Sequence, residues 1–318
     1  MIPGKNAVLL LAHGSPSSVS EVPEFLLRVT GGRPLPPQVV EEVSHRYGAI
    51  GKSPLTELTV KQGELLAQSM GMPVYIGMRN WHPFVAQALE QMQADGIRHA
   101  VVICLAPHNS RTSVGLYRKS LAQSTDPDFT FDFVESWHDQ PMLIKAFAGK
   151  LNAGLDVAIK ECSGTGISPV AAGSAPLIPV IFTAHSVPER GVLEGDPYEI
   201  QARETAALVA ASAGLKPEQW KFAFQSQGMS GGPWLGPTVE DTILDFKRAG
   251  HLGIFIQPIG FLCDHVEILY DIDIAFKQFA EKEGMRLWRA DSLNDSPLLT
   301  SALEQIVHSR MSAPAGVR

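Results

Sequence analysis

Two short stretches share one pattern: VIFTAHSVP occupies residues 180–188, and AVLLLAHGSP occupies residues 7–16. Each is an apolar run that ends in Ala-His and is followed, three residues after the histidine, by a proline. A short apolar run bounded by turn-forming residues is typical of a buried strand. This weak repeat predicts two similar α/β halves, each of which begins with its own strand and places a histidine at the end of that strand.

Apolar runs alternate with helical patterns through both halves. Strands are expected at residues 7–12, 74–78, 100–106, 129–134, 179–184, 221–225, 253–257 and 285–289. Helices of about ten residues or more separate most of these runs, which indicates parallel sheets with helices on both faces. The predicted fold class is therefore α/β, with two doubly wound domains, each built on a mainly parallel sheet.

The boundary between the halves is expected at residues 163–178, a stretch rich in Gly, Ala, Ser and Pro. Such a composition is typical of a linker. We therefore place an N-terminal domain at residues 1–160 and a C-terminal domain at residues 179–318. An alternative prediction for the last helix of the C-terminal domain is that it packs back on the first domain.

The composition argues against several classes of protein. The 318 residues are 45% hydrophobic and 19% charged, which is typical of a globular chain. The formal net charge of −7, without a long basic run, argues against nucleic acid as a partner. No apolar run reaches the ~18 residues of a transmembrane segment, and the first residues lack the pattern of a signal peptide. We expect a cytoplasmic protein.

The sequence also lacks the usual signatures of common cofactor and nucleotide sites. Cys104, Cys162 and Cys263 are far apart, and three cysteines cannot supply an all-cysteine iron–sulfur site. No GxGxxG follows a strand, and neither a P-loop motif nor a GxSxG motif occurs. Nucleotide binding and serine-hydrolase chemistry therefore have no support.

A run of acidic residues follows a strand-like segment in GFLCDHVEILYDID, residues 260–273. Glu267 and Asp271 are four residues apart and Asp264 precedes Glu267 by three, so on a helix these carboxylates share one face. In open α/β sheets, ligands bind outside the carboxyl ends of the strands. A solvated helix face is the alternative, although the neighbours of these acids are apolar.

His185 is the natural partner for these carboxylates because it ends a predicted strand. A neutral imidazole that faces a carboxylate can hold a divalent transition metal or pass protons. His13 follows the same logic at the end of the first strand. For His265, a structural role agrees with the sequence at least as well as a functional one. Arg33 and Arg46 are each suited to meet a carboxylate substrate.

Several motifs together resemble the ferrochelatase family. In the order in which that family has them, they are FTAHSVP (182–188), GDPY (195–198), FQSQG (224–228), WLGP (234–237) and GFLCDHVEILYD (260–271); the N-terminal half adds RY (46–47), SPL (53–55) and RNWHPF (79–84). The combination is specific and covers nearly the whole chain. The resemblance implies two Rossmann-like domains without a nucleotide, a porphyrin cleft between them, and insertion of ferrous iron into the porphyrin.

Within the family, the sequence is most similar to the bacterial coproporphyrin III type, on the basis of FLLRVTGGR (25–33) and RNWHP (79–83). That type implies insertion of Fe(II) into coproporphyrin III to give coproheme in haem biosynthesis. Three alternatives stay open. In the first, the same enzyme uses protoporphyrin IX. In the second, the chain is a chelatase for another tetrapyrrole. In the third, which is a different class of protein, it is a non-catalytic haem or metal carrier with the same fold.

The resemblance also implies roles for individual residues. His185 and Glu267 would be the catalytic pair that handles the metal, and Asp271 would be an outer metal-binding residue. A further set would line the porphyrin, namely His13, Thr30, Arg46, Tyr47, Ser53 and Tyr117.

Three positions depart from the family's pattern. His13 stands where many relatives of this type have a tyrosine that can ligate product iron, and histidine can still ligate haem iron. Thr30 stands where relatives often have a propionate-binding arginine, so Arg33 is the candidate to replace it. Ala275 stands where relatives continue the series of acidic residues, which argues against an outer metal site.

The resemblance implies that no cofactor is permanently bound and that porphyrin and Fe(II) are the substrates. It favours a monomer and a downstream haem-synthesis enzyme as a partner. Some actinobacterial relatives carry an iron–sulfur cluster, but the three cysteines here argue against one.

Overall fold

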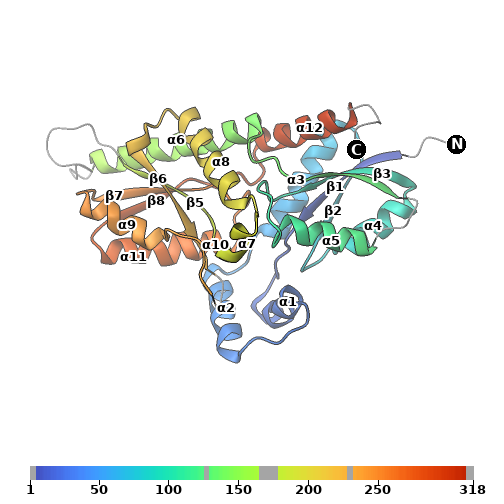
Figure 1. Cartoon of the computed structure of the whole chain (residues 1–318), viewed down its shortest axis with the longest axis horizontal. Coiled ribbons are helices and arrows are strands. Elements are labelled where there is room, and N and C mark those ends of the chain that lie inside the picture. The colour runs from blue at the N-terminus through green and yellow to red at the C-terminus, as the bar shows by residue number, and fades with distance from the viewer. Residues whose placement is uncertain (1–4, 125–128, 165–177, 228–231, 313–318) are drawn as a thin grey trace. The chain divides into compact units, whose positions relative to one another are not determined.

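The computed structural model describes residues 5–124, 129–164, 178–227 and 232–312. The chain forms two compact units: the first contains Met1–Trp137 and Asn294–Arg318, and the second contains His138–Leu293. Each unit has a four-stranded parallel sheet with helices packed on it (Figure 1). The predicted α/β class, with two doubly wound parallel sheets, is confirmed.

The first unit is built around a strand that is buried on both faces. Its elements are β1 (Lys5–Ala12), η1 (Val19–Glu21), α1 (Val22–Val29), α2 (Pro37–Ile50), α3 (Leu55–Met70), β2 (Val74–Met78), α4 (Val85–Ala94), β3 (Ile97–Cys104), α5 (Val114–Ser124), β4 (Thr130–Val134) and α12 (Pro297–Met311). The strand order is β2-β1-β3-β4. Because β1 lies inside the sheet, both of its faces need apolar side chains, and its last six residues are all buried.

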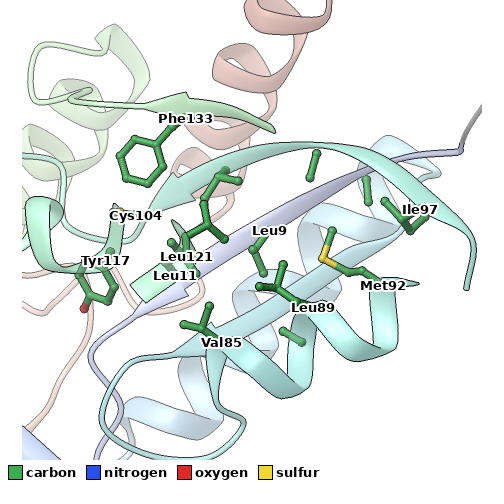
Figure 2. Close-up of a cluster of buried hydrophobic side chains, with 14 of the residues drawn as sticks. Leu9, Leu11, Val85, Leu89, Met92, Ile97, Cys104, Tyr117, Leu121 and Phe133 are labelled. Atoms are coloured by element: carbon green, nitrogen blue, oxygen red, sulfur yellow. The ribbon is translucent and has the colours of Figure 1, made fainter. Parts of the chain in front are cut away.

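Helices pack on both faces of this first sheet. Figure 2 shows one face, where Leu9 and Leu11 of β1 meet Val85 and Leu89 of α4. On the other face, α12 packs on α3 and β3 (Figure 1). The last helix of the chain therefore belongs to the first unit. α1 and α2 pack on each other beyond the end of β1.

The second unit repeats the strand order of the first. Its elements are α6 (Pro141–Gly164), β5 (Val180–His185), α7 (Glu189–Leu193), α8 (Tyr198–Ser212), η2 (Pro217–Gln219), β6 (Trp220–Gln225), α9 (Val239–Arg248), β7 (Gly253–Pro258), α10 (Val266–Leu269), η3 (Asp271–Phe276), α11 (Lys277–Lys282) and β8 (Arg286–Arg289). The order β6-β5-β7-β8 puts the first strand of the unit between the second and third, as in the first sheet.

This shared order gives β1 and β5 equivalent places. Each lies where the direction of winding reverses, and in open α/β sheets ligands bind outside the carboxyl ends of the strands at that point. His185 ends β5, and His13 directly follows β1. The repeat seen in the sequence thus corresponds to a repeat in topology.

The second sheet is also covered on both faces. α6 and α8 pack on one face, and α9 packs with the segment from α10 to α11 on the other (Figure 1). Ile181, Ile243, Ile256 and Ile272 belong to the buried cluster under α9 and η3. In the part of the chain that the structure describes, no helix is long and apolar enough to cross a membrane.

The boundary between the units differs from the prediction. α6, which the prediction assigned mostly to residues 1–160, belongs to the second unit because it packs on β7, β8 and α8. Gly154 permits this approach, since a Cβ atom there would lie 2.5 Å from Cζ of Phe255. The second unit also ends at Leu293 instead of at residue 318. Of the predicted linker, residues 165–177 lie outside the described residues.

Replacing Gly154 by alanine tests the packing of α6. The added methyl group would overlap Phe255, and overpacking a filled core costs on the order of 1–3 kcal/mol. We expect Gly154→Ala to lower the free energy of unfolding, measured by urea denaturation.

Gly149→Ala, on the same helix, is the matched control. No neighbouring atom outside its own helical backbone lies within 4 Å of a Cβ at this position. Alanine there should stabilise the protein by about 0.5–1 kcal/mol, because glycine costs more backbone entropy in a helix. Equal effects at the two positions would contradict the assignment of α6.

Candidate active site

His185 is held in one tautomer at the carboxyl end of β5. Its Nδ1 atom lies against the carbonyl oxygen of Ser186, which can only accept a hydrogen bond, so Nδ1 carries the proton. Nε2 then presents a lone pair, the state in which a neutral imidazole binds a metal or takes up a proton. The side chain is 33% exposed, so part of the ring is open to solvent.

Tyr198 supports the backbone of His185. Its hydroxyl is buried with the ring and donates to the carbonyl oxygen of His185 at 2.9 Å. Burial, and next the charge of Glu267, raise the pKa of Tyr198. The hydroxyl therefore stays protonated and remains a donor at neutral pH.

Glu267, in the first turn of α10, faces His185. Its Oε1 atom lies 3.6 Å from Nε2 of His185, and its side chain is 32% exposed. The separation is too long for a direct hydrogen bond. A metal ion with bonds of about 2.1 Å to one nitrogen and one oxygen would hold them about 3.4 Å apart in a tetrahedral arrangement. The pair therefore suits a shared divalent ion.

His265 flanks Glu267 on its other oxygen, which the sequence did not predict. The Nε2 atom of His265 lies 3.8 Å from Oε2 of Glu267. Its Nδ1 donates to the carbonyl oxygen of Cys263 at 3.0 Å, which fixes the same tautomer as in His185. The ring of Phe261 packs on His265, with centroids 4.5 Å apart, and meets His185 at 6.4 Å. Two imidazoles thus face Glu267, and one aromatic ring packs against both of them.

The acidic segment does not form the single regular helix on which its carboxylates were expected to share one face. α10 covers only Val266–Leu269, η3 is a π-helix over Asp271–Phe276, and α11 covers Lys277–Lys282. The amide of Ala275 donates to the carbonyl oxygen of Tyr270 at 2.9 Å, five residues back. Such π-turns are frequent at functional sites.

Asp264 is not part of a carboxylate ladder, so the prediction is wrong at this position. It precedes α10 and accepts a hydrogen bond from Ser292 at 2.7 Å and one from Arg289 at 3.3 Å. Arg289 also binds Asp273 with two bonds, at 2.7 and 2.8 Å. One mostly buried guanidinium therefore ties both ends of the segment that carries Glu267 to β8.

Asp271 lies within η3 and is buried. Its Oδ2 atom accepts a hydrogen bond from the hydroxyl of Ser226, just after β6. Gln225, the neighbour of His185 in the parallel sheet, donates from Nε2 to the backbone carbonyl of Glu267 at 3.0 Å. The end of β6 therefore holds the backbone of one predicted metal residue and the carboxylate of the other.

In the first unit, His13 and Tyr47 meet on one aromatic ring. Phe25 lies 5.8 Å from the His13 ring and 6.3 Å from the Tyr47 ring, between centroids, in edge-on geometry. Nδ1 of His13 donates to the carbonyl of the next residue at 3.0 Å, and Nε2 of the neutral ring accepts from the buried amide of Asn80, also at 3.0 Å. His13 is exposed, but its Nε2 atom is engaged.

Three other predicted porphyrin residues are buried in the first unit. The Tyr47 hydroxyl lies 3.1 Å from that of Ser15. Tyr117 belongs to the hydrophobic cluster of the sheet (Figure 2), and burial raises its pKa. The hydroxyl of Ser53 has no hydrogen-bond partner among the described residues. A buried polar atom without a partner suggests a place for a further donor or acceptor.

Thr30 and Arg46 are engaged near their own helices. The Thr30 hydroxyl faces the carbonyl oxygens of Leu26 and Leu27 at 3.0 and 3.1 Å, at the end of α1. Arg46 donates to Glu42 at 2.9 Å on α2, and its side chain is 38% exposed. Exposed pairs of this kind hold their partners weakly, so Arg46 can exchange its carboxylate more readily than Thr30 can release its backbone contacts.

Two donors, His185 and Glu267, meet at the candidate metal site in the described part of the chain. No group of three or more His, Cys, Asp or Glu residues in residues 5–124, 129–164, 178–227 and 232–312 is arranged to hold a metal ion. His185 and Glu267 would leave most of the coordination positions of an ion open. Open positions suit an ion that is passed on to another ligand.

Comparison with known proteins agrees with this chemistry. A family model described as ferrochelatase matches residues 5–311. The chain belongs to the ferrochelatase family. A ferrochelatase from Acidobacterium capsulatum is 51% identical, over 95% of this chain and 94% of the relative. A coproporphyrin III ferrochelatase from Geobacillus thermodenitrificans is 32% identical, over 96% of each.

Two solved structures of a chelatase share this fold. The sirohydrochlorin chelatase SirB from Bacillus subtilis subspecies spizizenii, in complex with cobalt, has a TM-score of 0.55 at 11% identity and covers 98% of this chain and 97% of that one. SirB from Bacillus subtilis with Fe3+ has a TM-score of 0.58 at 12% identity, over 97% and 96%. At such identities the likeness shows the fold alone.

Several residues of the candidate site were missed by the sequence reasoning. Tyr198, Gln225 and Ser226 lie in the GDPY and FQSQG motifs, which were quoted for the resemblance without a role for these side chains. Arg289 had no local signal, because its partners lie 16 and 25 residues earlier in the chain. The motifs were the only signal that could have found the first three.

Arg289→Met should destabilise the ferrochelatase fold and loosen the acidic segment. The substitution leaves Asp264 and Asp273 without their cation, where the side chains are 20% and 37% exposed. Breaking a buried pair costs about 3–5 kcal/mol, and the exposure of Asp273 reduces this to about 2 kcal/mol. Chemical denaturation measures the change.

Arg286→Met, on the same strand, is the control. Its partner is Glu161, and the two side chains are 40% and 49% exposed. Such a surface pair contributes about 1 kcal/mol or less. If both substitutions cost the same, the guanidinium of Arg289 does not clamp the acidic segment.

Proposed function

We propose that this ferrochelatase inserts ferrous iron into coproporphyrin III and so produces coproheme. The observation that carries the proposal is the facing pair of His185 Nε2 and Glu267 Oε1, 3.6 Å apart and each about one third exposed. A nitrogen lone pair and a carboxylate together suit Fe(II), which accepts imidazole and carboxylate ligands. The types of donor atom in this pair therefore support iron as the metal that is inserted.

The proposed mechanism divides the work between two side chains. Metal insertion requires the porphyrin to lose two N–H protons as the iron exchanges protein ligands for pyrrole nitrogens. His185 can accept a proton at Nε2, because the Ser186 carbonyl keeps the other proton on Nδ1. Glu267 supplies the carboxylate that holds the cation or receives the second proton. Asp271, which is buried in η3, has the proposed role of an outer metal-binding residue.

The binding of the porphyrin is proposed to involve the first unit. His13 is exposed and packs edge-on against the buried Phe25, which also meets Tyr47, so a flat, apolar ring would pack on His13 above this aromatic cluster. The remaining residues of the proposed set offer hydroxyl or guanidinium groups, namely Thr30, Arg46, Ser53 and Tyr117. Thr30 is the weakest member because its hydroxyl already faces backbone carbonyls.

Coproporphyrin III is favoured over protoporphyrin IX on two grounds. The motifs at residues 25–33 and 79–83 are similar to those of that type, and relatives named for coproporphyrin III are 31–32% identical to this chain over nearly its full length. Four propionates require more donors at the rim than two, and we assign Arg46 and the exposed Arg33 to this task. We also propose a cytoplasmic monomer that needs no permanently bound cofactor.

Anaerobic assays with Fe(II) test the substrate directly. Loss of free-porphyrin fluorescence should be faster with coproporphyrin III than with protoporphyrin IX, by about tenfold in kcat/KM, the factor that corresponds to 1.4 kcal/mol of additional binding energy. A preference for protoporphyrin IX would overturn the substrate but keep the chelatase. Tight binding of metalloporphyrin without turnover of either porphyrin would favour a carrier.

Substitution of the facing pair tests the mechanism. His185→Ala removes the proposed proton acceptor and should reduce kcat by about 10²–10⁴-fold. Glu267→Gln keeps the shape of the side chain but removes its charge, and should reduce kcat by about 10²-fold or more.

Two exposed residues serve as controls in the same assay. Glu281→Gln lies on α11, and His308→Ala lies on α12, so neither touches the facing pair. Both variants should retain the activity of the unmodified chain. Equal losses in the controls and in the site variants would remove the support for the assigned roles.

A further inference from the structure

Ser226 has a backbone conformation that serine rarely adopts. Its φ is +59°, and among the described residues only one other non-glycine residue, Asn294, has a positive φ. Asparagine tolerates this left-handed region, whereas serine is not specially suited to it. A residue held in this region costs free energy that other contacts must recover.

The contacts of Ser226 show what the conformation achieves. Its hydroxyl donates to Oδ2 of Asp271, a carboxylate with only 6% of its residue surface exposed. The Nε2 atom of Gln225 lies 3.4 Å from the same hydroxyl oxygen and donates to the carbonyl of Glu267 at 3.0 Å. Two adjacent residues at the end of β6 therefore fix Asp271 and the backbone of Glu267 together.

This arrangement is typical of the outer contacts of a metal site. Carboxylates that bind metals are usually oriented by hydrogen bonds from neighbouring donors, and those donors affect metal affinity although they do not touch the ion. Asp271 is placed in a π-helix, whose irregular turn alone does not determine the orientation of the carboxylate. The donor on β6 supplies that constraint.

We propose that Ser226 is a positioning residue for metal delivery to the His185–Glu267 pair, which orients the carboxylate of Asp271, four residues after Glu267, through a hydrogen bond from a left-handed backbone. The inference rests on the proposed function, since it names how that site receives its divalent ion. Its loss should weaken capture of the metal and leave porphyrin binding unchanged. The effect is therefore on the KM for metal and not on the KM for porphyrin.

Two variants separate the hydrogen bond from the backbone conformation. Glycine and asparagine both tolerate φ near +60°, but only asparagine carries an amide that can donate to a carboxylate. Ser226→Gly should raise the KM for Fe(II) and weaken binding of Co(II) to the porphyrin-free protein by about 10- to 100-fold. Ser226→Asn should stay close to the unmodified chain in both measurements.

Calorimetry with Co(II) and steady-state kinetics with Fe(II) give the two readouts. Asn294→Gly is the control, because it relieves the other positive φ, in the first unit, and should change neither. Asp271→Asn removes the acceptor charge, so adding Ser226→Gly to it should cause little further loss. This double-variant cycle remains informative if Ser226→Gly alone changes stability.

The outcomes distinguish this inference from the proposed function. If Ser226→Gly binds Co(II) as the unmodified chain does, or if Ser226→Asn is as weak as Ser226→Gly, Ser226 does not position Asp271. Independent, additive losses in the cycle would overturn it as well. If the unmodified chain binds Co(II) but metalates no porphyrin, the proposed function fails, and the comparison of Co(II) affinities still tests the positioning.

Discussion

The hydrogen bond from Nδ1 of His185 to the carbonyl of Ser186 is the constraint on which the site depends. Because a carbonyl only accepts, it fixes the proton of the neutral ring on Nδ1, so that the lone pair of this tautomer is on Nε2, facing Glu267. An imidazole with the opposite tautomer would present an N–H to the carboxylate and could not bind a cation there. The carboxyl ends of the strands, the buried Tyr198 and the π-helix all help to keep Nε2 of His185 and the carboxylate of Glu267 in place.

The acidic segment is held from two strands, and this explains how an irregular helix can carry a defined site. Arg289 on β8 binds Asp264 before α10 and Asp273 within η3, so the segment is fixed on both sides of Glu267. Gln225 at the end of β6 binds the backbone of Glu267 itself. A π-turn is less regular than an α-helix, and contacts of this kind replace the constraint that regular helical bonding would give.

The sequence predicted the features that depend on local pattern. Apolar runs that lead into a histidine predicted β1 and β5, and the spacing of acids after β7 singled out Glu267, which lies 3.6 Å from His185. The position of α6 could not be predicted, because it depends on the contact of Gly154 with Phe255, about a hundred residues apart in the chain. Asp264 and Glu267 look alike in sequence, and only the tertiary contact with Arg289 separates their roles. The buried apolar residues of this stretch, Ile268, Ile272, Phe276 and Ala280, are four residues apart as on one face of an α-helix, so their spacing does not reveal η3.

Nε2 of His185 is the atom that we propose to bind the divalent ion. Nitrogen-15 NMR of the imidazole side chains during titration with Zn(II), with His185→Gln to assign the signal, measures this directly. The structure predicts that Nε2 of His185 changes with added zinc while Nδ1 keeps its proton. Zinc that binds without altering His185, or that binds at its Nδ1, would contradict the claim.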